Sequence, residues 1–251
     1  MNKRSRMVIF APHPDDETLG CGGTIARKVE EGDDVIIVVM TDGRHAFSEI
    51  LKIESDPTPE ELKEIRKKEI EKATGILGVP CRNVLFLDFE DGMLEHYEKE
   101  AEERVSAILM EEKPAEIYYP YERDSNSDHR ATNRIVGNAT KKSGFPILRY
   151  RYSITQTYSR AGPIIDSILN FFKGNMIGFD ISKFIDLKRT ALKEFKSQTA
   201  IISSEQKKPI LSAQRLEMHL KNKEIFHIDK HEDRPVSLGK KVFVGTRFRR
   251  L

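Results

Sequence analysis

"MVIFAPHPDDETLGCGG" (residues 7–23) joins a short apolar run to a cluster of charged side chains and a glycine-rich segment. The apolar run, residues 7–11, has the length and composition of a strand that is buried on both faces. One imidazole and three carboxylates follow it within five positions, on His13, Asp15, Asp16 and Glu17. Like charges this close repel one another, so the stretch predicts a positively charged partner at the end of the strand.

Strand and helix patterns alternate through the first 155 residues. Continuous apolar runs predict further strands over residues 34–41, 83–88, 117–121 and 147–154. Helical patterns fill the intervals, over residues 18–31, 60–77, 98–112 and 131–142. Apolar strands alternating with helices are typical of a parallel sheet that is covered on both faces. The sequence therefore predicts an α/β fold with a mostly parallel sheet and helices on both faces.

The pattern is less regular after residue 155, where we expect a C-terminal elaboration of the same domain. Helices are predicted over residues 183–196 and 211–221, and residues 164–172 are apolar on several sides. We expect a single domain over residues 1–251. Its parts are a core (7–155), the elaboration (156–230) and a basic tail (231–251).

The composition excludes several classes of protein. The 251 residues contain 42 Lys and Arg against 40 Asp and Glu, and the resulting net charge of +2 predicts no nucleic-acid partner. Three arginines in the tail (Arg247, Arg249 and Arg250) are too few to change this, and we expect a solvated tail. Two cysteines, Cys21 and Cys81, indicate a reducing compartment without a disulfide framework. No apolar run is long enough for a signal peptide or a transmembrane segment, so we expect a cytoplasmic protein.

Polar side chains follow the predicted strands at the edge where open parallel sheets bind ligands, beyond the carboxyl ends at the point where the strand order reverses. If strands 7–11 and 117–121 are neighbours at that point, His13 and Asp16 face His129 across a crevice. Two imidazoles and one carboxylate suit Zn²⁺ when a further position stays open for water. The spacing therefore predicts a metal site.

A simpler interpretation of the same cluster stays open. Asp15, Asp16 and Thr18 have the side chains that cap helices, and they directly precede or begin a predicted helix. In that case the acids would only cap the helix and form local ion pairs.

Two charged residues lie on the apolar face of the helix predicted over residues 60–77. At 100° per residue, Arg66 and Glu69 fall within the apolar stripe, whereas the other charges lie outside it. The alternative is a surface pair three residues apart. Because charges on a core face are costly unless paired, the helical wheel favours a buried pair that has a functional role.

At these positions the chain resembles a known family. "PHPDDETLGCGGTIA" (12–26) is similar to the signature of the LmbE-like, or PIG-L, N-acetylglucosaminyl deacetylase family. The resemblance extends over about residues 7–228, through "TDG" (41–43), "RKKEIEKATGILGV" (66–79), "DG" (91–92), "SDHRAT" (127–132), "LKRTALKEFKSQ" (187–198) and "EIF" (224–226). It implies a Rossmann-like fold and one divalent metal, usually zinc, that serves to hydrolyse N-acyl groups on amino sugars.

The resemblance also implies roles for individual residues. The metal ligands would be His13, Asp16 and His129. Asp15 would be the general base, and Arg66 and Asp91 would lie on the substrate side of the site. His45 is expected on the same side because of its place in the loop after strand 34–41, and not because of the resemblance.

One position departs from the family pattern His-x-Asp-His. Here the stretch reads "NSDH", so Asn126 replaces the first histidine. An amide donates a hydrogen bond but carries no proton. Either Asn126 polarises the acyl carbonyl and Asp15 makes all proton transfers, or another group such as His45 replaces the missing histidine. Asp128, which would orient that histidine in the family, is expected to support His129 instead.

These inferences predict a zinc-dependent hydrolase that removes the N-acetyl group from an N-acetylglucosamine-type sugar or conjugate. Hydrolysis of another N-acyl amide stays open, and so does a non-catalytic metal-containing sugar-binding protein, although binding alone needs no base such as Asp15. A phosphoesterase would favour two metals and basic clamps, which the single ligand set disfavours. Residues 44–59 and 158–180 are the expected specificity elements, and the apolar 164–172 segment suggests a possible homo-oligomer.

Overall fold

The computed structural model describes residues 5–154 and 176–228. Within these ranges seven strands form one sheet in the order β3-β2-β1-β4-β5-β7-β6. β1 to β5 are parallel, whereas β7 runs antiparallel to both β5 and β6. The strands are β1 (Arg6–Ala11), β2 (Asp34–Thr41), β3 (Val84–Phe89), β4 (Glu116–Pro120), β5 (Leu148–Tyr152), β6 (Met176–Asp180) and β7 (Lys223–His227).

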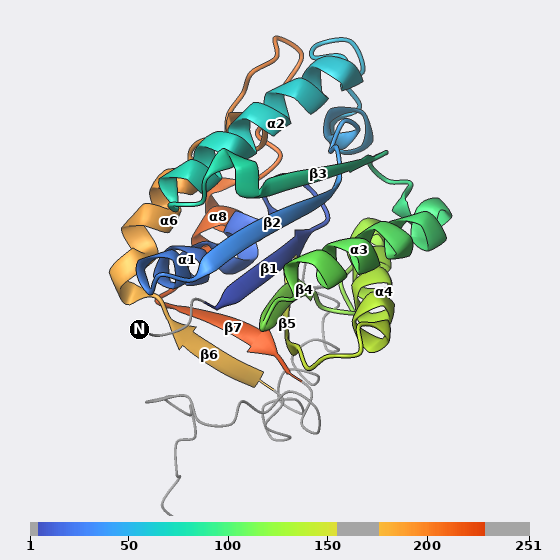
Figure 1. Cartoon of the computed structure of the whole chain (residues 1–251). Coiled ribbons are helices and arrows are strands. Elements are labelled where there is room, and N and C mark those ends of the chain that lie inside the picture. Colours follow the sequence, from blue (N-terminus) through green and yellow to red (C-terminus); the bar gives the residue numbers. More distant parts are fainter. Residues whose placement is uncertain (1–4, 155–175, 229–251) are drawn as a thin grey trace, which may run out of the picture.

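Helices cover both faces of this sheet (Figure 1). They are α1 (Asp16–Glu30), α2 (Pro59–Ile76), α3 (Glu98–Glu112), α4 (Ser127–Lys142), α6 (Ile185–Leu192), α7 (Lys196–Thr199) and α8 (Ala213–His219), with the short helices η1 (Phe47–Leu51), η2 (Cys81–Asn83), η3 (Leu94–Tyr97) and η4 (Ser182–Phe184). Side chains alternate along β1, so Met7 and Ile9 pack with α1, α2 and α6, whereas Val8 and Phe10 pack with α3 and α4. The predicted α/β fold with a mostly parallel sheet is confirmed.

The order of the strands places the switch point between β1 and β4. These two strands are parallel neighbours, with Val8 opposite Ile117, and β2 and β5 lie on their outer sides. The chain therefore leaves the carboxyl ends of β1 and β4 toward opposite sides of the sheet, which opens a crevice there. The turn after β1 and the loop after β4 are the segments that line it.

Several elements differ from the predictions. Helix α4 begins at Ser127 rather than at residue 131, because the Asn126 side chain caps it four residues earlier. The helix predicted over residues 183–196 is divided into η4, α6 and α7. The sequence pattern did not predict strands β6 and β7, and β6 occupies the end of the segment 158–180, which is an expected specificity element. The apolar segment 164–172 and the basic tail lie outside the described residues.

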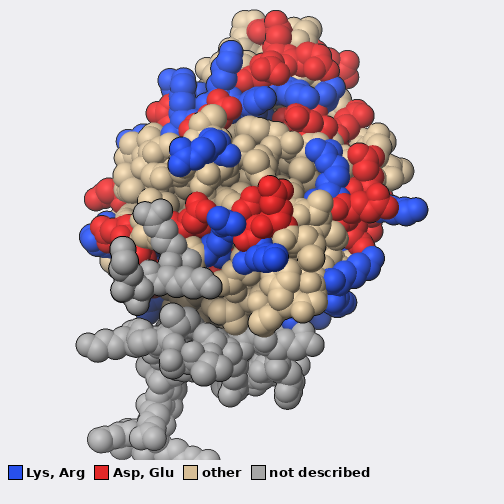
Figure 2. Space-filling view, viewed as in Figure 1, with Lys and Arg blue, Asp and Glu red and all other residues tan. Residues whose placement is uncertain are grey.

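The surface is charged but mixed. On the face shown in Figure 2, basic and acidic side chains are interspersed and do not gather into one field of a single sign. Among the described residues no helix combines the length and the apolar character that crossing a bilayer requires.

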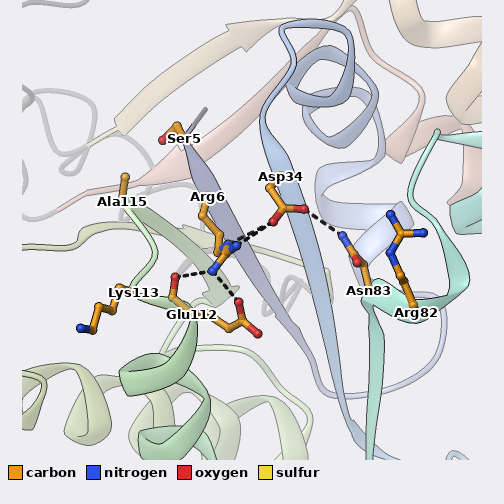
Figure 3. Close-up of a pocket in the computed structure, with 8 residues that line it drawn as sticks. All are labelled: Ser5, Arg6, Asp34, Arg82, Asn83, Glu112, Lys113 and Ala115. Atoms are coloured by element: carbon orange, nitrogen blue, oxygen red, sulfur yellow. Dashed lines mark hydrogen bonds and ion pairs between the residues drawn. The ribbon is translucent and has the colours of Figure 1, made fainter. Parts of the chain in front are cut away.

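A cavity of 680 Å³ lies at the opposite end of the sheet from the switch point (Figure 3). It is lined by Ser5, Arg6, Asp34, Arg82, Asn83, Glu112, Lys113 and Ala115. Arg6 is already paired there, 3.0 Å from Asp34 and 2.8 Å from Glu112. Since ligands of open α/β sheets bind beyond the carboxyl ends of the strands, the switch point is the better candidate for the functional site.

Candidate metal and catalytic site

Three side-chain donors meet beyond the carboxyl ends of β1 and β4. His13 lies in the turn after β1, Asp16 begins α1, and His129 lies in the first turn of α4. His13 Nδ1 lies 3.1 Å from Asp16 Oδ2 and 3.3 Å from His129 Nε2, and the Asp16 and His129 atoms are 3.1 Å apart. Ligand atoms around a tetrahedral zinc ion are about 3.3 Å from one another. The three atoms therefore fit one face of such a site, and the arrangement favours a metal centre over simple capping.

The second nitrogen of His13 faces two carboxylates. His13 Nε2 lies 3.3 Å from Asp128 Oδ2 and 3.1 Å from Asp91 Oδ1. With its proton on Nε2, the imidazole presents the Nδ1 lone pair to an ion, as in the carboxylate–histidine pairs of metal sites. Asp128 thus contacts His13, and the expectation that it supports His129 is wrong.

The loop after β3 fixes these two carboxylates. Asp128 accepts hydrogen bonds from the backbone N–H groups of Gly92 (2.7 Å) and Leu94 (3.2 Å). Asp91 Oδ2 accepts from the backbone N–H of His45 at 3.0 Å. The loops after β2 and β3 therefore hold the groups that orient His13.

His129 has a supporting carboxylate that the sequence pattern did not single out. Its Nδ1 lies 3.2 Å from Oδ2 of Asp124, which is buried. Asp124 Oδ1 also accepts from the backbone N–H of Asn126 at 3.1 Å. Asp124 follows β4 in the same polar loop, but only the structure shows which acid in that loop faces the imidazole.

The charged side chains of this cluster shift one another's pKa values. Burial alone would lower the pKa of His129, but Asp16 and Asp124 raise it to about 9. Burial likewise opposes protonation of His13, yet Asp128, Asp16 and Asp91 raise its pKa well above the ordinary value. Burial would raise the pKa of Asp16, but the two imidazoles hold it well below its usual range. A bound cation would replace these protons, since metal ligands must be deprotonated, and the donor set fits a divalent ion such as zinc.

Asp15 lies beside the donor triangle without being part of it. Its carboxylate is buried and makes no capping hydrogen bond to α1, and Arg66 Nη2 lies 3.3 Å from its Oδ1. Its backbone has φ +156° and ψ −24°, a conformation that is strained for an L-residue. Burial raises the pKa of Asp15 to about 7, although the Arg66 guanidinium opposes the shift. Among the described residues its Oδ2 has no hydrogen-bond partner.

The charged pair predicted on the core face of α2 is buried, which confirms that part of the helical-wheel prediction. Arg66 is 3% exposed and donates to the carbonyl oxygens of Gly43 and Pro14, both at 3.0 Å. Glu69 is 7% exposed and accepts from the backbone N–H and the hydroxyl of Ser197 at 2.7 and 2.6 Å. Arg66 therefore joins the loops around the site, whereas Glu69 ties α2 to α7.

The Asn126 side chain uses its oxygen to cap α4 and leaves its nitrogen available. Its Oδ1 accepts from the backbone N–H groups of Asp128 (2.8 Å) and His129 (3.3 Å) as the N-cap of α4. Capping fixes the orientation of the amide, because only the oxygen accepts. Within the described ranges the Nδ2 group has no partner, so it is an available hydrogen-bond donor directly before the helix that carries His129.

The His45 imidazole contacts Glu90 and Ser48 rather than the donor triangle. Its Nε2 lies 3.0 Å from Glu90 Oε1, and its Nδ1 lies 3.5 Å from the Ser48 hydroxyl. Its backbone N–H, not its imidazole, contacts the Asp91 carboxylate. The loop over residues 44–59 that carries it contains the π-helix η1.

Known proteins are similar to this chain in sequence and in fold. Diacetylchitobiose deacetylase of Thermococcus kodakarensis is 26% identical over 204 residues, which are 78% of this chain and 71% of that protein. A probable N-acetyl-alpha-D-glucosaminyl L-malate deacetylase 2 of Bacillus cereus is 29% identical over 204 residues, 78% of this chain and 84% of that protein. The solved structure of N,N'-diacetylchitobiose deacetylase from Pyrococcus horikoshii has the same fold, with a TM-score of 0.64 at 22% identity over 90% of this chain and 84% of that one.

The fold and the donor triangle define an α/β protein with a candidate metal centre at its switch point. The family profile of PIG-L, described as GlcNAc-PI de-N-acetylase, matches residues 8–140. The chain belongs to the PIG-L family of N-deacetylases.

Proposed function

We propose that this protein is a zinc-dependent deacetylase that removes the acetyl group from an N-acetylglucosamine-type sugar or conjugate. The observation that carries the proposal is the triangle of His13, Asp16 and His129, with the buried Asp15 carboxylate beside it. The named activities of the relatives, which act on diacetylchitobiose and on a glucosaminyl malate, support this class of substrate.

His13, Asp16 and His129 would hold one zinc ion per chain. Held there, the ion would polarise the acyl carbonyl and lower the pKa of the attacking water toward about 7. Asp91 and Asp128 keep the His13 imidazole in the tautomer that such an ion requires.

Asp15 is the proposed general base. Its Oδ2 takes a proton from water as the water oxygen forms a bond to the acetyl carbon, and the carboxyl then gives that proton to the amide nitrogen as the C–N bond breaks. The products are acetate and the free amine of the sugar. Arg66 holds Asp15 Oδ1, so we assign it a positioning role, and we place His45 at the rim, where it meets the sugar.

Asn126 is the proposed donor for the acyl oxygen. Its Nδ2 group is the only part of the side chain that capping leaves available, and negative charge develops on the carbonyl oxygen as water attacks. In this scheme Asn126 moves no proton, and Asp15 makes both transfers.

The test is release of amine from N-acetylglucosamine, its disaccharide and an inositol-linked form, with Asp15→Asn as the matched variant. We expect the wild type to release amine from at least one of the three. The variant keeps its zinc and loses about 10²- to 10⁴-fold in turnover, because only the proton transfers are removed. Near-normal turnover in Asp15→Asn would rule out the base. Release from none of the sugars, with zinc bound, would point to another N-acyl amide or to a binding protein.

We also propose a cytoplasmic location. Cys21 is buried and Cys81 is exposed, and both are free thiols, as expected in a reducing compartment. Fractionation of the source cells would check this, and recovery from the extracellular fraction would contradict it.

A further inference from the structure

Side chains from the C-terminal part of the chain enter the hydrogen-bond ladder of α1. The backbone N–H groups of Gly23 and Thr24 donate to the two carboxylate oxygens of Glu224 at 2.9 and 2.8 Å, and the Thr24 hydroxyl donates to the same group at 2.5 Å. In an uninterrupted helix these N–H groups would donate to the carbonyls of the residues four positions earlier. Glu224 lies in β7, 200 residues away from Thr24.

A buried lysine occupies the other side of the same ladder. Lys188 of α6 donates from Nζ to the Leu19 carbonyl at 2.8 Å and to Glu224 Oε1 at 2.7 Å. The Leu19 carbonyl is the acceptor that the Gly23 N–H would use in a regular helix. Lys188 is 1% exposed and Glu224 is 5% exposed. The two charged groups thus form one inserted pair that contacts the α1 backbone between its second and third turns.

Glycine residues make this insertion sterically possible. A Cβ atom on Gly22 would lie 3.0 Å from Lys188 Cγ, and one on Gly23 would lie 2.4 Å from Ile181 Cδ1. The segment "LGCGG" in the opening motif therefore lets the C-terminal elements approach the α1 backbone. Figure 1 shows α6, α8 and β7 gathered around α1.

An apolar contact would attach α1 to the sheet without the desolvation that a buried ion pair incurs. The inserted pair instead fixes individual backbone atoms of α1. The segment that precedes the insertion carries Asp16 at its first residue, and Asp15 comes directly before it. Small shifts of that segment would move Asp16 relative to His129, which is carried by α4.

We propose that Glu224 and Lys188 are positioning residues for the metal site, which hold the first two turns of α1 so that Asp16 meets His129. The proposal rests on the proposed function only in taking the triangle as a metal site. Both residues lie outside the segment 8–140 that the family profile matches. The C-terminal part of the chain thereby takes part in building the site at the other end of α1.

The experiment compares Glu224→Gln and Lys188→Met with the wild type. Zinc affinity is measured by competition with a chelator, and hydrogen exchange is measured on residues 16–22, both at a temperature where each variant is folded. We expect zinc affinity to fall about 10- to 100-fold, as for loss of a group that orients a ligand, and exchange in residues 16–22 to quicken. Neither readout requires turnover, so a failed deacetylase assay would leave this proposal intact and would count only against the proposed function.

A surface pair supplies the matched control. Lys183 and Glu30 pair at 2.5 Å on the far end of α1, and their side chains are 69% and 52% exposed. Lys183→Met and Glu30→Gln should leave zinc affinity within about twofold, as for an exposed ion pair.

A double variant keeps the test decisive if a single substitution in the pair prevents the protein from folding. The double substitution Lys188→Met with Glu224→Met leaves no uncompensated buried charge and is expected to fold. Weaker zinc binding in this folded variant supports the proposal. Unchanged zinc affinity and unchanged exchange of residues 16–22 would overturn it, and would leave the pair as a structural brace only.

Discussion

At the residue scale, the site depends on which atom of each side chain already makes a contact within the fold and which atom stays available. Oδ1 of Asn126 caps α4, and its Nδ2 is left as a donor. His13 turns Nδ1 toward Asp16 and Nε2 toward Asp128. The orientation of the His13 ring matters because an imidazole nitrogen that binds metal cannot also carry a proton. With the ring turned over, the nitrogen that faces Asp16 would no longer be the one that offers its lone pair to an ion.

Replacing Asn126 by Ser separates its two roles. Serine caps helices about as well as asparagine, so the free energy of unfolding should stay within about 0.5 kcal/mol of the wild type. The variant lacks the Nδ2 donor, and we expect turnover to fall about 10²- to 10³-fold, as for other lost oxyanion donors. Chemical denaturation and amine release measure the two effects. Unaltered turnover would exclude Asn126 as the donor.

The meeting of His13, Asp16 and His129 could be predicted from the sequence, because parallel strands gather their carboxyl ends at one edge. The partners of the two histidines could not. Asp124 and Asp128 are four residues apart in sequence and support different imidazoles. Their assignment depends on where α4 begins, and that depends on the Asn126 cap.

At the element scale, α1 is held by close contacts that its glycines permit. A Cβ on Gly23 would lie 2.6 Å from Ile181 Cβ, an atom next to the backbone that cannot move aside easily. A Cβ on Gly137, inside α4, would have no heavy atom within 4 Å among the described residues beyond its own stretch of helix. The two glycines therefore offer a matched pair within two helices of similar length.

We expect Gly23→Ala to lower the free energy of unfolding by about 2 kcal/mol or more, because the methyl group overpacks the contact with Ile181, directly before η4. Gly137→Ala should raise it by about 0.5 to 1 kcal/mol, from helix propensity alone. Urea denaturation of both variants measures this. Equal effects of the two substitutions would contradict the close approach at Gly23.

Elements differ in how far their sequence predicts them. β1, β2 and β4 are continuous apolar runs that fill the middle of the sheet, so composition alone identifies them. β7 reads Lys-Glu-Ile-Phe-His and mixes charged and apolar residues, since it lies toward the edge and carries Glu224 to α1. The sequence also carries a signal for the burial of Lys188, which the sequence analysis did not use. Lys188 falls in the apolar stripe of Phe184, Ala191, Leu192 and Phe195, just as Arg66 falls in the apolar stripe of α2.

At the scale of the whole molecule, the C-terminal strands are joined to the half of the chain that carries the site. The His227 ring at the end of β7 stacks on Tyr121, directly after β4, with ring centroids 3.8 Å apart. Burial, assisted by Arg151, lowers the pKa of His227 to about 4. The lowered pKa of His227 therefore makes the stability of the protein depend on pH.

The direction of this pH dependence follows from the linkage between protonation and folding. In the unfolded chain His227 takes up its proton near pH 6.5, whereas the folded protein resists protonation until about pH 4. Its contribution is complete above pH 6.5 and is lost as the pH falls toward 4, by up to about 3 kcal/mol. His227→Phe keeps a stacked ring and removes the titration. We expect the free energy of unfolding of the variant to rise relative to that of the wild type as the pH falls from 7 to 4. A difference between the two proteins that stays constant over this range would contradict the expectation.

We propose that one zinc ion at His13, Asp16 and His129 supports deacetylation. The most direct test titrates zinc into metal-free protein while zinc content and amine release are followed together, with His13→Ala as the variant and the exposed His96→Ala as the control. We expect activity to rise to a plateau at one zinc per chain in the wild type and in His96→Ala, whereas His13→Ala should neither hold zinc nor release amine. Full zinc occupancy in His13→Ala, or full activity of the metal-free wild type, would contradict it.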